Sequence, residues 1–475
     1  MPDDIASLLT DLSGRGIHLR LENNALKYTA QPGALTPDIR ARLQAAKSQV
    51  IDILRQSDAA LLPASLTQRR FYALQQLDPD WSFYNVPFLF RLTGPLDPDR
   101  LRGALNAIVA RHDSLRTTLH EREGKLIQIV AASGETEWEY ADQRDAPPEA
   151  ADALMRHDMM RRFDLSLGPM LRATLVRVAD DAHLFQICLH NVVFDMASLL
   201  TILDELSAHY AEHILPPPVQ YAEYTRWQAA RIAAGMDRRR AYWTPWFAKG
   251  PQPAWSWPEP ATPPAQAGFD SLPTWARLPP EQNARLQAFC RSCGVTPYIA
   301  VLTAYLRATR DLTGCTDLTI GTTYSDRDDH RFASMIGASV MVPALRVDMT
   351  DDPGFPALLR RVRDVVAAAL DNQDLPAGEV VPTALNGPLF KLVCTAFPET
   401  PHGRLRLPGI RASWVEERFN PISRPTLYLV VWETPTPMGN VLTCHMMHRQ
   451  DVWDAATAAR MMRTFETVLR SIADS

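Results

Sequence analysis

The stretch HLFQICLHNVVFDMAS, residues 183–198, is the most informative part of the chain. An apolar run with β-strand character occupies its first half, and a helical pattern begins just after Asp195. The loop between them holds His190 and Asn191, and Ser198 follows in the first turn of the helix. Loops of this kind often carry reactive side chains. A histidine at a strand end and an aspartate before a helix are also common structural features, so both interpretations stay open here.

The sequence on either side of this stretch mixes strand and helix patterns. Residues 65–215 include the amphipathic segment LRGALNAIVARH and the strand-like segment LRATLVRV. A second mixed half, residues 272–475, ends in the helical pattern AATAARMMRTFETVLRSIA. Residues 216–271 are rich in proline and predict a connection between the two halves. We therefore expect an α/β (α+β) protein with two lobes and a cleft between them.

Residues 1–56 predict a separate small unit with the order helix, strand, strand, helix. Two alternating segments, residues 17–21 and 25–29, are joined by Glu-Asn-Asn, and asparagine tolerates the backbone of tight hairpin turns. Thr36 precedes a proline and suits the N-cap of the second helix. Residues 57–64 then predict a linker to the larger part of the chain.

Composition excludes several classes of protein. The formal charge of −5 over 475 residues argues against a bulk nucleic-acid binder. Since no apolar run is long enough to span a bilayer and the N-terminus lacks a signal-peptide pattern, we expect a cytoplasmic protein without a membrane partner. Cys290 and Cys293 form a CxxC at the end of a helical pattern, without a second ligand pair. This favours ordinary thiols and no metal site over a redox or zinc role.

Eight segments of the chain follow one another in a recognisable order. They are SLTQRRFYAL (65–74), YNVP (84–87), RHDSLRTTL (111–119), HNVVFDMAS (190–198), YAEYTRWQ (221–228), DLTIGTTYSDR (317–327), MIGASVMVPALRV (335–347) and NQDLP (372–376). In this order they resemble the condensation-domain family of nonribosomal peptide synthetases, from about residue 63 to residue 475. The resemblance implies a two-lobed, chloramphenicol-acetyltransferase-like fold with a central cleft.

Residues 1–56 resemble the TubC-type N-terminal docking domain, most clearly in GALTPDIRARL, residues 33–43. The resemblance implies that this unit holds the C-terminal tail of an upstream synthase, which we expect to be a polyketide synthase. An exposed hairpin edge can accept an added strand. His18, Arg20 and Lys27 lie on or near the hairpin, so we expect an acidic tail. The alternative is an ordinary solvated hairpin face.

The condensation-domain resemblance also implies a reaction. An amine on a downstream carrier protein attacks an acyl or peptidyl thioester on an upstream one, and an amide forms. The phosphopantetheine arms belong to the carrier proteins, so the resemblance implies no bound cofactor and no metal.

The candidate catalytic residues are Asn191 and His190, but Asn191 stands where the family usually has a second histidine. An amide does not take up a proton near neutral pH. Holding two reactants in attack geometry contributes roughly 7–11 kcal/mol, and an α-amino group with a pKa near 7.7–8.0 is already partly neutral. We therefore expect catalysis by positioning, with His190 holding the loop and with amide formation favoured over ester formation. The resemblance also implies that Asp195 pairs with Arg327 in a structural role.

Three further residues are expected to shape the tunnel for the reactants. Met196 replaces the family's glycine and Met341 replaces a common asparagine, and Ser198 is the third of these residues. The alternatives are a catalytically silent recruitment scaffold, or altered chemistry such as heterocyclisation, esterification or dehydration. A cleft that admits both arms favours the enzyme, and a cavity closed at Met196 favours the scaffold.

Overall fold

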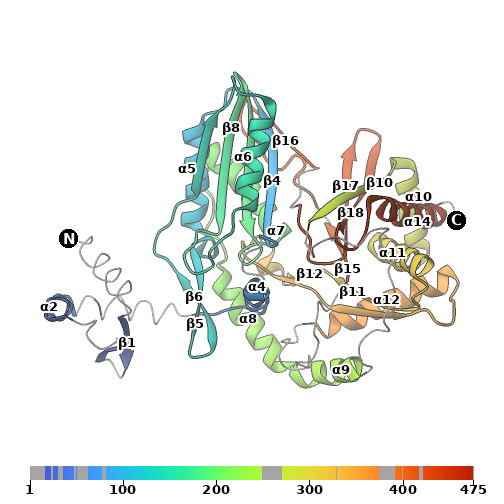
Figure 1. Cartoon of the computed structure of the whole chain (residues 1–475), viewed down its shortest axis with the longest axis horizontal. Coiled ribbons are helices and arrows are strands. Elements are labelled where there is room, and N and C mark those ends of the chain that lie inside the picture. Colours follow the sequence, from blue (N-terminus) through green and yellow to red (C-terminus); the bar gives the residue numbers. More distant parts are fainter. Residues whose placement is uncertain are drawn as a thin grey trace. The chain divides into compact units, whose positions relative to one another are not determined.

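The computed structural model of the chain divides into two compact units (Figure 1). One unit comprises residues 1–64 and 118–130, and the other comprises residues 65–117 and 131–475. Residues whose structure is described are 17–22, 25–29, 36–47, 50, 62–77, 82–248, 270–327, 329–373, 391–397, 399–416 and 421–473. The helix expected before residue 17 and the end of the NQDLP segment lie outside them.

The smaller unit contains the expected hairpin. Strand β1 (His18–Glu22) pairs antiparallel with β2 (Ala25–Thr29). Helix α2 (Pro37–Ala45) follows, and the Thr36 side chain accepts a hydrogen bond from the N–H of Ile39, as an N-cap does. A second small sheet has the order β3 (Leu62–Pro63), β6 (Lys125–Val130), β5 (Thr117–Arg122).

The first half of the larger unit is built on a five-stranded sheet. Its order is β16 (Arg411–Trp414), β4 (Asn85–Thr93), β9 (Ala182–His190), β8 (Leu171–Ala179) and β7 (Glu137–Asp142). Strands β8 and β9 are buried along most of their length, which explains their nearly continuous apolar sequences. The helices of this half are α5 (Pro98–Arg111), α6 (Pro148–Met160) and α7 (Met196–Tyr210).

The second half is built on a six-stranded mixed sheet. Its order is β10 (Ser271–Leu278), β18 (Gly439–Arg449), β17 (Leu427–Thr436), β15 (Leu392–Phe397), β11 (Asp317–Thr322) and β14 (Ala344–Asp348). Its main core joins this sheet to α10 (Pro280–Ser292), α11 (Pro297–Thr313), α12 (Phe355–Asp371) and α14 (Ala455–Ala473). The mixed α/β architecture with two sheet-based halves is confirmed.

Further helices and short strands lie around these sheets. Helix α4 (Leu66–Leu77) begins the larger unit, and the proline-rich connection contains α8 (Tyr221–Ala234) and α9 (Met236–Ala248). Strands β12 (Tyr324–Ser325) and β13 (Val340–Met341) pair with each other. None of the described helices is both long enough and apolar enough to cross a membrane.

Candidate active site

The loop after β9 is tied to its neighbours by backbone hydrogen bonds. The N–H of His190 donates to the carbonyl oxygen of Met170 at 3.1 Å. The next N–H, that of Asn191, donates to the carbonyl oxygen of Tyr84 at 2.9 Å. Asp195 caps α7 by accepting from the N–H of Ser198 at 2.8 Å. The loop therefore presents Asn191 from a fixed backbone.

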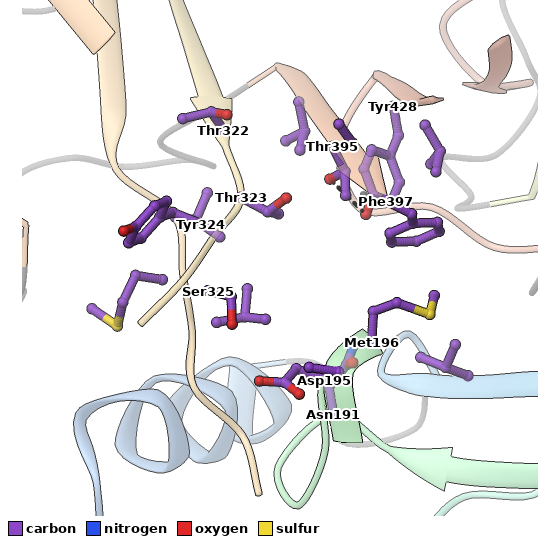
Figure 2. A pocket seen from close by; sticks show the side chains of 18 of the residues that line it. Asn191, Asp195, Met196, Thr322, Thr323, Tyr324, Ser325, Thr395, Phe397 and Tyr428 are labelled. Atoms are coloured by element: carbon purple, nitrogen blue, oxygen red, sulfur yellow. Dashed lines mark hydrogen bonds between the residues drawn. The ribbon is translucent and has the colours of Figure 1, made fainter. Parts of the chain in front are cut away.

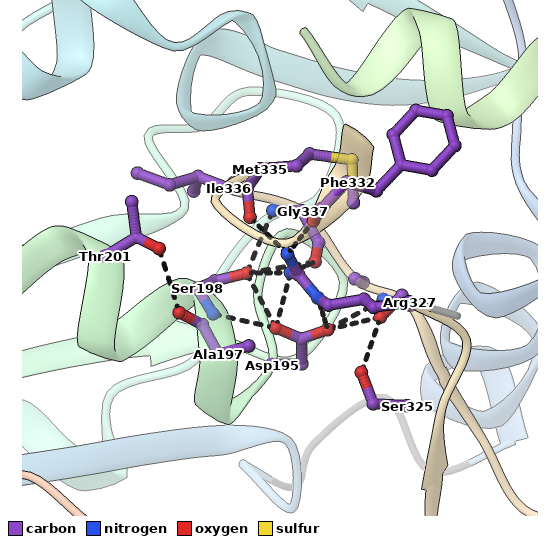
Figure 3. A network of polar contacts seen from close by, with 12 residues as sticks. Asp195, Ala197, Ser198, Thr201, Ser325, Arg327, Phe332, Met335, Ile336 and Gly337 are labelled. Atoms are coloured by element: carbon purple, nitrogen blue, oxygen red, sulfur yellow. Dashed lines mark hydrogen bonds and ion pairs between the residues drawn. The ribbon is translucent and has the colours of Figure 1, made fainter. Parts of the chain in front are cut away.

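Asp195 and Arg327 form a buried ion pair with two contacts (Figure 3). Nη2 of Arg327 lies 2.7 Å from Oδ1 of Asp195, and Nε lies 3.1 Å from Oδ2. The Arg327 side chain is 7% exposed and the Asp195 side chain is 1% exposed. The guanidinium also donates to the carbonyl oxygens of Phe332, Met335 and Gly337. The pair therefore fastens a segment of the second half to the start of α7.

The surroundings of Asp195 keep it ionised. Burial acts to raise the pKa of its carboxyl, but Arg327 and the donors from Ser198 and Ser339 outweigh burial, so the pKa lies below its ordinary value. Since these donors occupy both carboxylate oxygens, the group stabilises the loop and has no proton to exchange near neutral pH.

A cavity of about 2330 Å³ lies beside this loop, and both halves contribute to its wall. The first half supplies Asn191 and Met196, which face Thr395, Phe397 and Tyr428 of the second half (Figure 2). The Asn191 side chain is partly exposed and makes no hydrogen bond to any described residue. Its amide is therefore available to a reactant in the cavity.

The lining of the cavity continues beyond Met196 along α7. Leu200, Thr201 and Asp204 extend it from the first turn of the helix toward the third. Met341 also lines the cavity and packs with Leu66. The two methionines thus shape the space, but Met196 does not close it.

Ser198 was expected to shape the tunnel, but its side chain does not line the cavity. It is fully buried. Its Oγ lies 2.8 Å from Oδ1 of Asp195, 2.8 Å from Nη2 of Arg327 and 3.0 Å from the backbone N–H of Gly337. The expectation that Ser198 shapes the tunnel directly needs correction, because its hydroxyl serves the ion-pair network.

His190 lies behind the cavity wall. It is 2% exposed, and its Nδ1 accepts a hydrogen bond from the N–H of Val192 at 3.1 Å. The rings of Tyr84 and Phe163 contact it edge-on, with centroids 6.1 and 5.8 Å away. Burial, with Arg172 adding to it, lowers the pKa of His190 to about 3. The imidazole is therefore neutral at cellular pH and positions the loop without touching the cavity.

Comparison with known proteins identifies the family of this site. The family described as the Condensation domain matches residues 59–475. The chain belongs to the condensation-domain family. The family described as the TubC N-terminal docking domain matches residues 5–56.

Curated relatives are much longer than this condensation domain. Cyclosporin synthetase of Tolypocladium inflatum is 31% identical over 379 residues, which are 76% of this chain and 2% of that protein. Chondramide synthase of Chondromyces crocatus is 31% identical over 432 residues, 87% of this chain and 11% of that protein. The chain thus spans a small part of these relatives.

Solved structures share the fold at lower identity. The X-domain from teicoplanin biosynthesis has a TM-score of 0.75 at 23% identity, covering 87% of this chain and 95% of that one. The EpoB cyclization-docking bidomain from Sorangium cellulosum has a TM-score of 0.71 at 20% identity, covering 99% and 98%. A structure described as the molecular basis for condensation domain-mediated chain release from the enacyloxin polyketide synthase has a TM-score of 0.65 at 22% identity, covering 98% and 95%.

The docking hairpin holds the three basic residues named from the sequence. His18 and Arg20 lie on β1 and Lys27 lies on β2. Arg20 and Lys27 are partners in the strand register. The two strands form a two-stranded sheet, so the described hairpin has a strand edge on each side.

Neither metal binding nor cysteine chemistry receives support from the geometry. No group of three or more His, Cys, Asp or Glu side chains in the described residues is arranged to hold a metal ion. Cys290 is buried, and burial raises the pKa of its thiol to about 11, with Cys293 adding to it. Such a thiol stays protonated and unreactive near neutral pH.

Several residues that line the cavity of the condensation domain were not predicted from the sequence. Arg70 and Tyr84 lie in segments that were used to recognise the family, but their side chains were not singled out. Thr395 and Tyr428 are hydrogen-bonded to each other at 3.1 Å on the facing wall. They lie in apolar strand sequences that carry no motif, so no signal in the sequence pointed to them.

Proposed function

We propose that this condensation domain joins an acyl or peptidyl thioester on an upstream carrier to an amine on a downstream carrier. The amine nitrogen attacks the thioester carbonyl, a C–N bond forms and the C–S bond breaks. The proton lost by nitrogen passes to the departing sulfur, so the products are an amide and a free pantetheine thiol. The observation that carries this proposal is the Asn191 side chain, which has no partner among the described residues and lies on a cavity that continues past Met196.

The proposed catalysis is by positioning. Asn191 has no proton-accepting nitrogen at cellular pH, and His190 is neutral and enclosed behind the wall. The Asn191 side-chain oxygen accepts a hydrogen bond from the attacking amine and orients its lone pair. Fixing the two reactants in this way contributes roughly 7–11 kcal/mol. An alcohol nucleophile would gain less, because it must lose its proton as it attacks.

The docking domain would recruit the upstream partner. A free strand edge of the β1–β2 hairpin suits an extended tail that adds a strand. His18, Arg20 and Lys27 favour an acidic tail. Because one structural neighbour concerns condensation domain-mediated chain release from the enacyloxin polyketide synthase, we infer that the partner is a polyketide synthase.

A second candidate is a silent recruitment scaffold. The observation in its favour is that no titratable side chain occupies position 191 while His190 is buried away from the cavity. The teicoplanin X-domain has been solved in a complex with OxyB. By analogy, this domain would bind a partner without forming a bond.

The test is a single-turnover assay read by intact-protein mass. The upstream carrier is loaded with an acyl chain and the downstream carrier with an aminoacyl group. The wild type, Asn191→Ala and Asn191→His are compared with a reaction that lacks the condensation domain. Mass transfer by the wild type, reduced in Asn191→Ala, is the expected result. Transfer by Asn191→His alone would overturn the proposal and favour the scaffold.

A further inference from the structure

Arg70 of α4 lines the cavity, and no counter-ion for it lies among the described residues. Its guanidinium lies 5.4 Å from the centroid of the Phe71 ring, near the phenols of Tyr84 and Tyr428. Its Nη1 is fully enclosed and has no hydrogen-bond partner among the described residues. A guanidinium remains charged in proteins, so Arg70 is a partly buried cation that none of the described residues neutralises.

The acidic residues that line the same cavity have other partners. Asp195 pairs with Arg327, and Arg404 pairs with both Asp204 and Glu399. Their side chains therefore do not balance the charge of Arg70.

Glu433 is the remaining acidic residue among those lining the described cavity. It accepts hydrogen bonds of 2.7 Å from Gln287 and from Asn440. No ion pair joins Arg70 to a carboxylate in the part of the chain that the structure describes. Burial lowers the pKa of Arg70, the direction expected for an enclosed cation, although Tyr84 and Tyr428 oppose it.

A second cation lies beside the same phenol. Nη1 of Arg424, which lines the cavity from the second half, lies 3.4 Å from the Tyr84 hydroxyl. The carbonyl oxygen of Tyr84 in turn holds the N–H of Asn191. Tyr84 thus contacts Arg424 through its hydroxyl and the loop that carries Asn191 through its carbonyl oxygen.

We propose that one of the two reactants carries a carboxylate and that Arg70 binds it inside the cavity. This inference rests on the proposed function and names the substrate class of the same site. A guanidinium matches a carboxylate because two parallel N–H donors meet two oxygens. The carboxylate comes either from an untethered amino acid or from the acidic side chain of a carrier-bound aminoacyl group.

The first experiment measures binding without turnover. Saturation-transfer NMR gives the affinity of the full chain for 5-aminopentanoate and for 5-aminopentanamide, which lacks the charge. We expect at least tenfold weaker binding of the amide, because hydrogen bonds between charged groups are the stronger ones. Arg70→Gln removes this preference, whereas Arg460→Gln, a change of the same charge at an exposed position of α14 outside the cavity lining, keeps it. Equal affinities in the wild type overturn the inference.

The second experiment identifies the source of the carboxylate. In the single-turnover assay, free 5-aminopentanoate and 5-aminopentanamide form one pair of acceptors. Carrier-bound aspartyl and asparaginyl groups form the other pair. A preference for the charged member in either pair, lost in Arg70→Gln, supports the inference and names the source. Turnover without a preference in either pair overturns it.

The two proposals fail in different ways. If no acceptor reacts but 5-aminopentanoate still binds through Arg70, the result contradicts the amide-forming function and supports the carboxylate site. If the melting curve shows Arg70→Gln to be unfolded, tighter binding of 5-aminopentanoate than of 5-aminopentanamide by the wild type supports the inference, and equal binding overturns it.

Discussion

Gly337 lies so close to the ring of Tyr221 that a Cβ on this glycine would approach Cδ2 of the tyrosine to 2.0 Å. The Tyr221 hydroxyl lies 2.6 Å from the carbonyl oxygen of Ala338 and 2.7 Å from Oγ of Ser65. The ring therefore packs against one residue of the segment while its hydroxyl binds the next. Position 337 therefore requires glycine because the Tyr221 ring leaves no space for a Cβ atom.

Gly337→Ala is expected to destabilise the chain by about 1–3 kcal/mol, the usual cost of forcing extra volume into a packed interior. The measurement is urea unfolding followed by tryptophan fluorescence. Gly103→Ala on α5 is the matched control, since no atom lies within 4 Å of its added Cβ. That change is expected to be neutral or to stabilise by up to about 1 kcal/mol. Equal losses for the two variants would contradict the steric account.

Arg327→Met is expected to cost about 3–5 kcal/mol, because it leaves the Asp195 carboxylate buried without its partner. Since the folded pKa of Asp195 is depressed, its stabilising contribution is complete above about pH 4 and is lost as pH falls through the folded pKa. Unfolding free energy measured from pH 7 to pH 3 should therefore decline less in Asp195→Asn than in the wild type. Parallel curves would show that Asp195 does not contribute to acid sensitivity.

The pH dependence of the reaction rate should follow the pKa of the attacking amine rather than the pKa of an enzyme side chain. His190 has a pKa of about 3 and stays neutral above pH 5, and Asn191 does not titrate. Single-turnover rates of the wild type should rise through the amine pKa near 7.7–8.0 without an earlier inflection. Asn191→His should add an inflection near 6.5, the ordinary value for histidine. An inflection between pH 5.5 and 7 in the wild type would reveal a general base elsewhere.

Met196→Ala should widen the cavity with little loss of stability, because Met196 is partly exposed and lies on the wall facing Phe397. A branched acyl donor should then react with a kcat/KM raised about tenfold relative to a straight one, the scale of one or two methylene groups in a pocket. Competition between the two donors, read by product mass, measures this. An unchanged ratio would mean that the acyl chain does not reach Met196.

The sequence predicted the parts of the site that are local in the chain. The pattern around residues 183–198 predicted the strand, the loop and the helix, and Thr36 predicted the start of α2. The facing wall was not predictable, because Thr395 and Tyr428 meet only through the pairing of β15 with β17. Ser198 was misplaced for a related reason. Helical spacing predicts that Ser198 lies in the first turn of α7. It does not predict that the segment around Gly337 covers this side chain.

Arg70 shows a different limit. Its residue type and its helix were readable from the sequence. That no described carboxylate neutralises it depends on where each described acidic residue of the cavity points. A charge becomes informative only when its surroundings are known in three dimensions.

Strand β16 pairs with β4, although Ser413 and its register partner Arg91 are 322 residues apart. During synthesis, one edge of the first sheet therefore has to wait until β16, which begins at Arg411, has left the ribosome. A chain cut after residue 248 would yield a first fragment with a vacant strand position and a second fragment carrying the missing strand. We expect the two fragments to bind each other in solution and to restore the sheet. The two halves of the larger unit are therefore expected to fold cooperatively.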